Sequence, residues 1–213
     1  MKNSLTGYCA AIICTSSSFL FTINHAHAAS ISDLLITEVM ANPAAVSDGN
    51  GEWFELYNPG TNAIKLSGIV LSDDGSNQHT ISSANDLFIS AGDYFVLGRN
   101  GDSSQNGGIE LDYVYSSFTL GNSSDQIILT DSIGNELRLE YESGFSSSGN
   151  STELIALGTY GFTDSNQIFG DGDIGTPGFA GSYLPAVSAV PLPASAWLFV
   201  SGLLGLMGFS RRQ

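Results

Sequence analysis

The chain has little positive charge, almost no cysteine and few histidines. Six Lys and Arg residues stand against 21 Asp and Glu, which gives a net charge of -15. Such an acidic chain repels phosphate backbones and anionic lipid surfaces, so we expect no nucleic-acid partner. The two cysteines, Cys9 and Cys14, both lie in the apolar N-terminal segment. If that segment is removed, disulfide frameworks, thiolate zinc sites and cysteine catalysis are all excluded from the mature chain.

The body of the chain also lacks helical periodicity. Between Ile31 and about Tyr183, short apolar runs alternate with clusters of Gly, Ser, Asn and Asp. Seven runs are predicted as strands, and short strands with one buried face each favour an all-β, two-layer sandwich. The predicted strands are Leu34–Val39, Glu52–Asn58, Gly68–Ser72, Tyr94–Gly98, Gln126–Thr130, Glu136–Tyr141 and Thr152–Ala156.

One hairpin is especially clear. Leu137, Leu139 and Tyr141 alternate with charged residues, as expected for a strand with one covered face. The segment Asp131–Asn135 has the composition of a tight turn and is predicted to join this strand to Gln126–Thr130.

The N-terminus has the pattern of a secretory signal peptide. Lys2 precedes an uncharged apolar run from Tyr8 to Ile23, and Ala26-His27-Ala28 places small residues where signal peptidase needs them. We expect a signal helix over residues 1–28 and cleavage after Ala28. After that cleavage, His79 is the one histidine left in the chain.

The C-terminus carries a short apolar segment followed by two cations. Ala194–Phe209 contains sixteen uncharged residues, a helix of about 24 Å, just enough for a locally thinned bilayer. Arg211 and Arg212 are expected to stay on the cytoplasmic side, which places the body of the protein outside.

This C-terminal arrangement resembles the PEP-CTERM sorting signal, whose substrates are processed by exosortase, a membrane-embedded cysteine transpeptidase. The matching segments are Val190-Pro191-Leu192-Pro193-Ala194, Trp197-Leu198-Phe199, Ser201-Gly202-Leu203-Leu204-Gly205 and Arg211-Arg212. Leu192 departs from the pattern, which has glutamate there, so the exosortase subtype stays open. The alternative is a permanent tail anchor without processing.

A second resemblance covers the body of the chain. The motif Glu52–Pro59 is familiar, together with Ile36–Val39 before it and Ile89–Leu97 and Gly175–Gly178 after it. Over roughly Ser32 to Gly178 the chain resembles the lamin-tail domain, an immunoglobulin-like sandwich found in nuclear lamins and secreted bacterial proteins. The resemblance implies a binding or structural module, and it supplies no catalytic residues. The expected organisation is a signal peptide at 1–28, the sandwich domain at 29–183, a linker at 184–190 and the sorting signal at 191–213, with its transmembrane helix at 194–209.

Two pairs of carboxylates are candidates for acid–base chemistry. Glu52 and Glu55 lie three residues apart on a predicted strand, so they point to opposite faces and cannot flank one bond. Glu140 and Glu142 share a face at about 7 Å, near the glycosidase range, but Arg138 on the same face favours a solvated surface.

Two further groups of residues are candidates for a catalytic site and for a metal site. His79 follows Asp73 and Asp74 and would be the base of a Ser-His-Asp set, but no serine occupies a Gly-x-Ser-x-Gly turn, so packing or surface exposure is favoured. Asp164, Asn166, Asp171 and Asp173 form a weak calcium pattern of hard oxygen ligands in a flexible segment.

Residues 48–57 offer two further candidates, one for calcium and one for carbohydrate. Asp48, Asn50 and Glu52 offer a weaker calcium set, for which turn formation is the alternative. Trp53 and Tyr57 share a strand face and would suit carbohydrate stacking, although core burial is favoured.

These patterns predict an exported, exosortase-processed, non-enzymatic protein of a Gram-negative cell surface or extracellular matrix. Its expected partners are signal peptidase, exosortase, the membrane through 194–209, and extracellular polysaccharide or surface components. No cofactor is expected, apart from calcium. The alternative is an extracellular hydrolase, a glycosidase or nuclease, that uses loop carboxylates with a divalent cation. A calcium-stabilised structural domain is the third hypothesis.

Overall fold

The structure, a computed structural model, describes residues 29–159 and 161–184. The predicted signal helix, residues 185–190 of the predicted linker and the predicted tail helix lie outside these residues. Within the described ranges, no helix combines the length and the apolar character that a membrane crossing requires.

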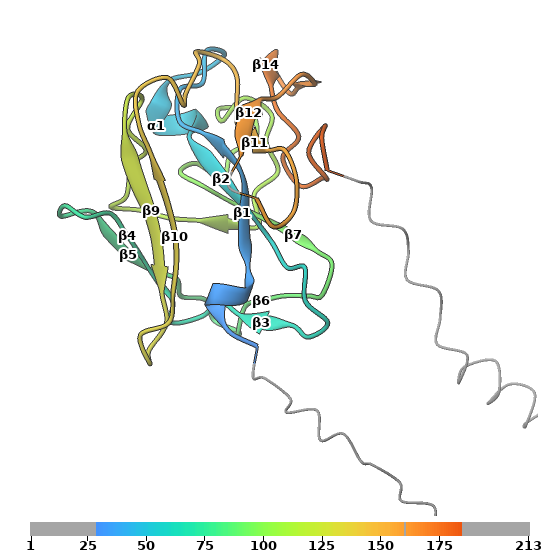
Figure 1. The fold of residues 1–213 in the computed structure, drawn as a ribbon. Helices are drawn as coiled ribbons and strands as arrows, with labels where there is room; N and C mark the ends of the chain where they lie inside the picture. Colours follow the sequence, from blue (N-terminus) through green and yellow to red (C-terminus); the bar gives the residue numbers. More distant parts are fainter. Residues whose placement is uncertain (1–28, 160, 185–213) are drawn as a thin grey trace, which may run out of the picture.

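Two antiparallel sheets form the body of the protein and face each other (Figure 1). Parallel pairing occurs between the last two strands of the larger sheet. The larger sheet has the order β12 (Phe162–Asp164), β11 (Thr152–Leu154), β1 (Leu35–Met40), β2 (Trp53–Tyr57), β7 (Tyr94–Gly98), β8 (Tyr113–Val114). The smaller sheet has the order β10 (Glu136–Tyr141), β9 (Asp125–Thr130), β4 (Val70–Ser72), β5 (Gln78–Thr80).

Short elements complete the fold. A 3-10 turn η1 (Ile31–Asp33) leads into β1, and α1 (Asp48–Gly51) leads into β2. Two small ribbons pair β13 (Ile168–Phe169) with β14 (Asp173–Ile174) and β3 (Ile64–Lys65) with β6 (Phe88–Ile89).

The prediction of an all-β, two-layer sandwich is confirmed, and each of the seven predicted strands has a counterpart. The β9–β10 hairpin runs in register from Glu136 opposite Thr130 to Tyr141 opposite Asp125. Some strand ends differ from the prediction where the backbone conformation interrupts the hydrogen bonds between strands. For example, β4 begins at Val70 because Gly68 has a φ of +90°, which a strand residue does not adopt.

The main core lies between the two sheets. Phe54 from β2 packs against Tyr115 with ring centroids 5.9 Å apart, and Tyr115 meets Phe118 edge to face at 5.5 Å. Leu71 and Leu129 contribute from the smaller sheet and are fully buried. The alternation predicted for Leu137, Leu139 and Tyr141 thus places that face of β10 toward this core.

A second, smaller core covers the opposite face of the larger sheet, which we call the outer face. It contains Met40, Trp53, Val96 and Ile109, with Phe169 packed edge to face on Trp53 at 6.0 Å. Trp53 is therefore core, as the sequence favoured, and not an exposed stacking platform. Because both faces of β1 and β2 are covered, polar side chains on the outer face are buried too.

Candidate functional site

A row of three buried glutamates crosses the outer face of the larger sheet. Glu38 on β1 lies directly opposite Glu55 on β2 and directly opposite Glu153 on β11. Residues that pair across neighbouring strands point to the same face. All three side chains are at most 1 % exposed. We call Glu38, Glu55 and Glu153 the glutamate row.

A β-bulge in β1 gives the row its geometry. The pairing between β1 and β2 shifts register between Ile36 and Glu38, which leaves Thr37 as an extra residue. Ile36 and Val39 therefore both reach the main core, although they are three residues apart. The Thr37 hydroxyl donates to Oε1 of Glu55 at 2.7 Å, so Thr37 serves the glutamate row.

The end of the described chain lies over the row. We call residues 173–184 the C-terminal strap. Its Thr176 amide donates to Glu38 Oε1 at 2.8 Å, and the Thr176 hydroxyl donates to Glu38 Oε2 at 2.6 Å. The Gly178 amide donates to Glu55 Oε2 at 2.7 Å, and the Ser182 amide to Glu153 Oε2 at 2.9 Å. Every glutamate of the row thus binds the strap.

Within residues 29–159 and 161–184, no ion pair neutralises the glutamate row. The ion pairs of the described residues do not include Glu38, Glu55 or Glu153. The Ser151 hydroxyl donates to Glu38 Oε1, but Oε1 of Glu153 is buried without a hydrogen-bond partner. Burial of carboxylates without a cation disfavours their charged forms.

The pKa values follow from this environment. Burial raises the pKa of Glu38 to about 7 from an ordinary value of 4.5, and the neighbouring Glu153 adds to the increase. Hydrogen bonds from Ser151 and Thr176 act in the opposite direction. Burial also raises the pKa of Glu55 well above 4.5, with Glu38 as the second cause. Glu38 and Glu55 are thus buried carboxyls that hydrogen-bond other parts of the fold and whose charged forms are disfavoured.

Glu52 lies apart from the glutamate row. The sequence predicted that Glu52 and Glu55 point to opposite faces, and the two carboxylates do have different partners. Its Oε2 accepts hydrogen bonds from the Leu120 amide at 3.1 Å and from Arg99 Nη1 at 3.3 Å. Burial raises the pKa of Glu52 to about 7, and these two partners oppose the increase. Glu52 therefore links the start of β2 to the segment before β9 through the Leu120 amide.

The exposed carboxylates on β10 form a solvated surface. Arg138 makes an ion pair with Asp74 and lies 3.7 Å from Glu140 Oε2. Glu140 and Glu142 are both exposed, and neither lines the groove beside β10 that is described below. This is the arrangement that the sequence favoured over a glycosidase pair.

His79 takes part in a local polar network. Its Nε2 lies 2.8 Å from the Tyr113 hydroxyl, and its Nδ1 accepts from the Ser116 amide at 3.3 Å. Burial lowers the pKa of His79 below 6.5, so the ring is neutral at pH 7. Among the described residues, neither ring nitrogen hydrogen-bonds a carboxylate, so the geometry of a Ser-His-Asp set is missing there.

The residues of the predicted calcium set are spread out. Asp164, Asn166 and Asp171 are exposed, whereas Asp173 is buried. The Asp173 carboxylate accepts two backbone amides, each 3.0 Å from Oδ1, in the segment that precedes α1. Within 29–159 and 161–184, no three His, Cys, Asp or Glu side chains gather closely enough to hold a metal ion. Calcium binding therefore stays a prediction, and the three aspartates of the set do not form a cluster that could hold the ion.

The residues of the earlier calcium set, Asp48, Asn50 and Glu52, each hydrogen-bond a different part of the protein. Asp48 Oδ2 accepts from Asn122 at 3.1 Å, and Asn50 Oδ1 accepts from Asn100 at 3.1 Å. Because Glu52 is occupied by Leu120 and Arg99, the oxygen atoms of this set hold loops together.

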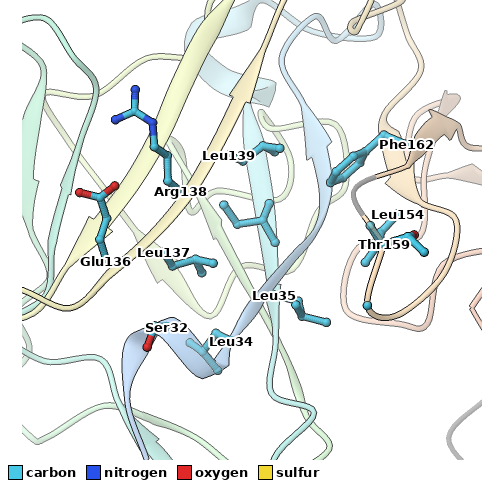
Figure 2. A pocket seen from close by; sticks show the side chains of 12 residues that line it. Ser32, Leu34, Leu35, Glu136, Leu137, Arg138, Leu139, Leu154, Thr159 and Phe162 are labelled. Atoms are coloured by element: carbon cyan, nitrogen blue, oxygen red, sulfur yellow. The ribbon is translucent and has the colours of Figure 1, made fainter.

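A groove of about 380 Å³ opens at the side of the sandwich, between β10, the start of β1 and the β11–β12 hairpin. Figure 2 shows apolar side chains along its walls and the charged Glu136 and Arg138 at one side. The apolar walls include Leu34, Leu137, Leu139, Leu154 and Phe162. Such a lining suits an apolar or amphipathic ligand. Sequence patterns did not indicate the groove, because its walls come from three separate segments.

The predicted processing residues lie outside the described part of the chain. These are Ala28, Val190, Pro191, Leu192, Pro193, Arg211 and Arg212.

Comparison with known proteins gives one family. A family model described as Lamin Tail Domain matches residues 27–144, which is more than half of the chain. A search of the curated proteins finds no match. The matched range contains β1 to β10, so β11 to β14 and the C-terminal strap follow it.

Proposed function

Since this chain belongs to the lamin tail domain family, we propose that it is a non-enzymatic structural and binding module of the cell surface or extracellular matrix. The observation that carries the proposal is the use of its buried carboxylates. Glu38, Glu52 and Glu55 all bind backbone amides or side chains of the protein itself. Carboxylates that bind the fold itself support a structural role, and the apolar groove beside β10 has a lining that suits a ligand.

The route to the surface is the second part of the proposal. Signal peptidase removes residues 1–28 after Ala28, and helix 194–209 holds the precursor in the inner membrane. Exosortase then acts at the segment that begins with Val190-Pro191-Leu192-Pro193 and ends with Arg211-Arg212. The sequence pattern at both ends supports this route.

Mass spectrometry of the protein recovered from producing cells tests the route. We expect an N-terminus at Ala29 and a C-terminus near Pro193. Recovery of intact chain from Met1 to Gln213 in the cytosol contradicts export. A cell-bound form that retains Arg211 and Arg212 replaces processing with a permanent tail anchor.

The groove can be tested with matched variants of the full chain. Leu137→Ser places a hydroxyl in the groove wall, and Ile133→Ser changes a side chain that is 84 % exposed and does not line the groove. We expect Leu137→Ser to reduce retention on the cell surface or in matrix polysaccharide, and Ile133→Ser to leave it unchanged. Equal retention of the two variants and the parent chain removes the groove from the binding function.

The competing hydrolase function has a direct test as well. Purified protein is assayed on polysaccharides and on DNA, with and without calcium. We expect no turnover. Turnover that disappears on a single change, such as Glu140→Ala or Glu142→Ala, would replace the binding module with an enzyme.

A further inference from the structure

The C-terminal strap fits closely against the carboxyls beneath it. A Cβ atom added to Gly175 would lie 2.9 Å from Glu38 Oε1, and one added to Gly181 would lie 2.8 Å from Glu153 Oε2. Both distances are shorter than ordinary van der Waals contact. The strap therefore lies over the glutamate row, with glycine at two positions where a side chain would not fit without a shift.

Polar contacts hold most of the strap in place. Thr176, Gly178 and Ser182 donate to the three glutamates, while the rings of Phe179 and Tyr183 are 73 % and 48 % exposed. Leu184 is the buried apolar side chain at the end of the strap. Residues 173–175 are also held by backbone hydrogen bonds, including the β13–β14 pairing. The attachment of residues 176–184, in which two large rings face water, therefore rests mainly on the hydrogen bonds to the carboxyls beneath them.

We propose that Glu38 and Glu55 of the glutamate row act as a proton-controlled latch, which holds the C-terminal strap closed while these carboxyls are protonated and releases it as they ionise. The latch goes beyond a passive binding module because it makes the position of residues 173–184 depend on the pH outside the cell.

Among the described residues, the groups that raise the pKa values of the row are themselves acidic. Glu153 faces Glu38 from β11 and Glu55 faces it from β2. Asp112, before β8, raises the pKa of Glu55, and Glu55 in turn raises the pKa of Tyr94 on β7. The charged residue of the strap itself is Asp173, which accepts two amides before α1. Each ionisation therefore raises the cost of the next one, and opening the strap relieves that cost by admitting water.

The direction of the effect follows from the pKa of Glu38, which is about 7 in the folded protein against an ordinary 4.5. The closed state binds the proton more tightly than an open, hydrated state does. Closure is therefore favoured most below pH 4.5, and that advantage disappears as the pH rises through about 7.

Hydrogen–deuterium exchange on the full chain in detergent tests the latch. Exchange is followed by mass spectrometry between about pH 5 and about pH 8, with correction for intrinsic exchange rates. Each pH unit changes the balance by up to about tenfold per carboxyl. We expect protection of residues 173–184 to fall at least tenfold over the series, whereas protection of the β9–β10 hairpin changes less.

Glutamine variants separate the latch from general acid or base effects. Glu38→Gln and Glu55→Gln keep the side-chain shape, and the hydroxyls of Thr176 and Thr37 can turn to accept from the new amide groups. We expect either variant to reduce the pH dependence of strap exchange. The exposed Glu140→Gln is the matched control and should leave it unchanged.

Strap protection that does not change with pH in the parent chain overturns the latch. An unchanged pH dependence in the double variant Glu38→Gln/Glu55→Gln also overturns it. Protection of the β9–β10 hairpin reports whether each variant is folded. If a variant does not fold, the pH series on the parent chain still decides the question.

Discussion

Glu52 should make the stability of the whole domain depend on pH. Its carboxylate is 3 % exposed and holds Arg99 and the Leu120 amide, and its pKa is about 7 in the folded protein against 4.5 ordinarily. A raised folded pKa means that the contribution to stability is complete below pH 4.5 and is lost as the pH rises through about 7. The free energy of unfolding should therefore fall across this window.

The magnitude follows from proton linkage. One proton bound more tightly by the folded state is worth about 1.4 kcal/mol per pH unit. Between pH 4.5 and about 7, Glu52 therefore contributes up to ~3 kcal/mol. That is a large share of the roughly 5–15 kcal/mol that stabilises a typical domain.

The measurement compares the parent chain with Glu52→Gln by urea unfolding at a series of pH values, followed by the fluorescence of the buried Trp53. Glu38 and Glu55 contribute slopes of the same sign, so the parent curve falls more steeply than one group requires. We expect Glu52→Gln to reduce the slope by about 1 kcal/mol per pH unit. Glu140→Gln, an exposed carboxylate, is the control and should keep the parent slope.

Two results would refute this reasoning. The first is a free energy of unfolding that rises between about pH 5 and pH 7 in the parent chain. The second is a slope in Glu52→Gln equal to that of the parent, which would mean that the carboxylate ionises normally within the folded domain.

Three further changes test the packing around the site by urea unfolding. Phe54→Ala removes a fully buried ring between the sheets and should cost about 3–5 kcal/mol, whereas Ile133→Ala, on an exposed side chain, should cost almost nothing. Asp173→Ala removes a buried carboxylate that accepts from two backbone amides and should cost about 1–3 kcal/mol; an equal loss in Asp171→Ala, an exposed neighbour, would contradict that cause. Gly175→Ala introduces a Cβ 2.9 Å from Glu38 Oε1 and should destabilise the protein by about 1–3 kcal/mol, and an unchanged midpoint would show that the strap does not fit as described.

The sequence was sufficient for the sandwich because its signals are local. Alternating apolar residues in Glu136–Tyr141 and a turn at Asp131–Asn135 specify the β9–β10 hairpin without knowledge of distant segments. Strands such as β5 (Gln78–Thr80) were missed because they lack an apolar alternation and form only when a neighbouring strand supplies the ladder. Tertiary pairing, not propensity, creates these short elements.

The glutamate row could not be predicted, because it depends on three non-local conditions. The bulge at Thr37 changes which face Glu38 occupies, and no residue type announces it. The pairing of Glu38 with Glu153 joins segments more than a hundred residues apart. Burial then comes from the strap, which a sequence pattern describes only as a Gly-rich turn at Gly175–Gly178.

The C-terminal strap contacts the glutamate row and is the described segment nearest in sequence to the C-terminus. The family match ends at residue 144, yet Glu38 and Glu55 inside it are covered by residues beyond it. In the sequence, the strap is followed by the segment that we propose exosortase to process. If the proposed latch operates, a change in the glutamate row acts first on the strap, because the strap donates hydrogen bonds to all three glutamates.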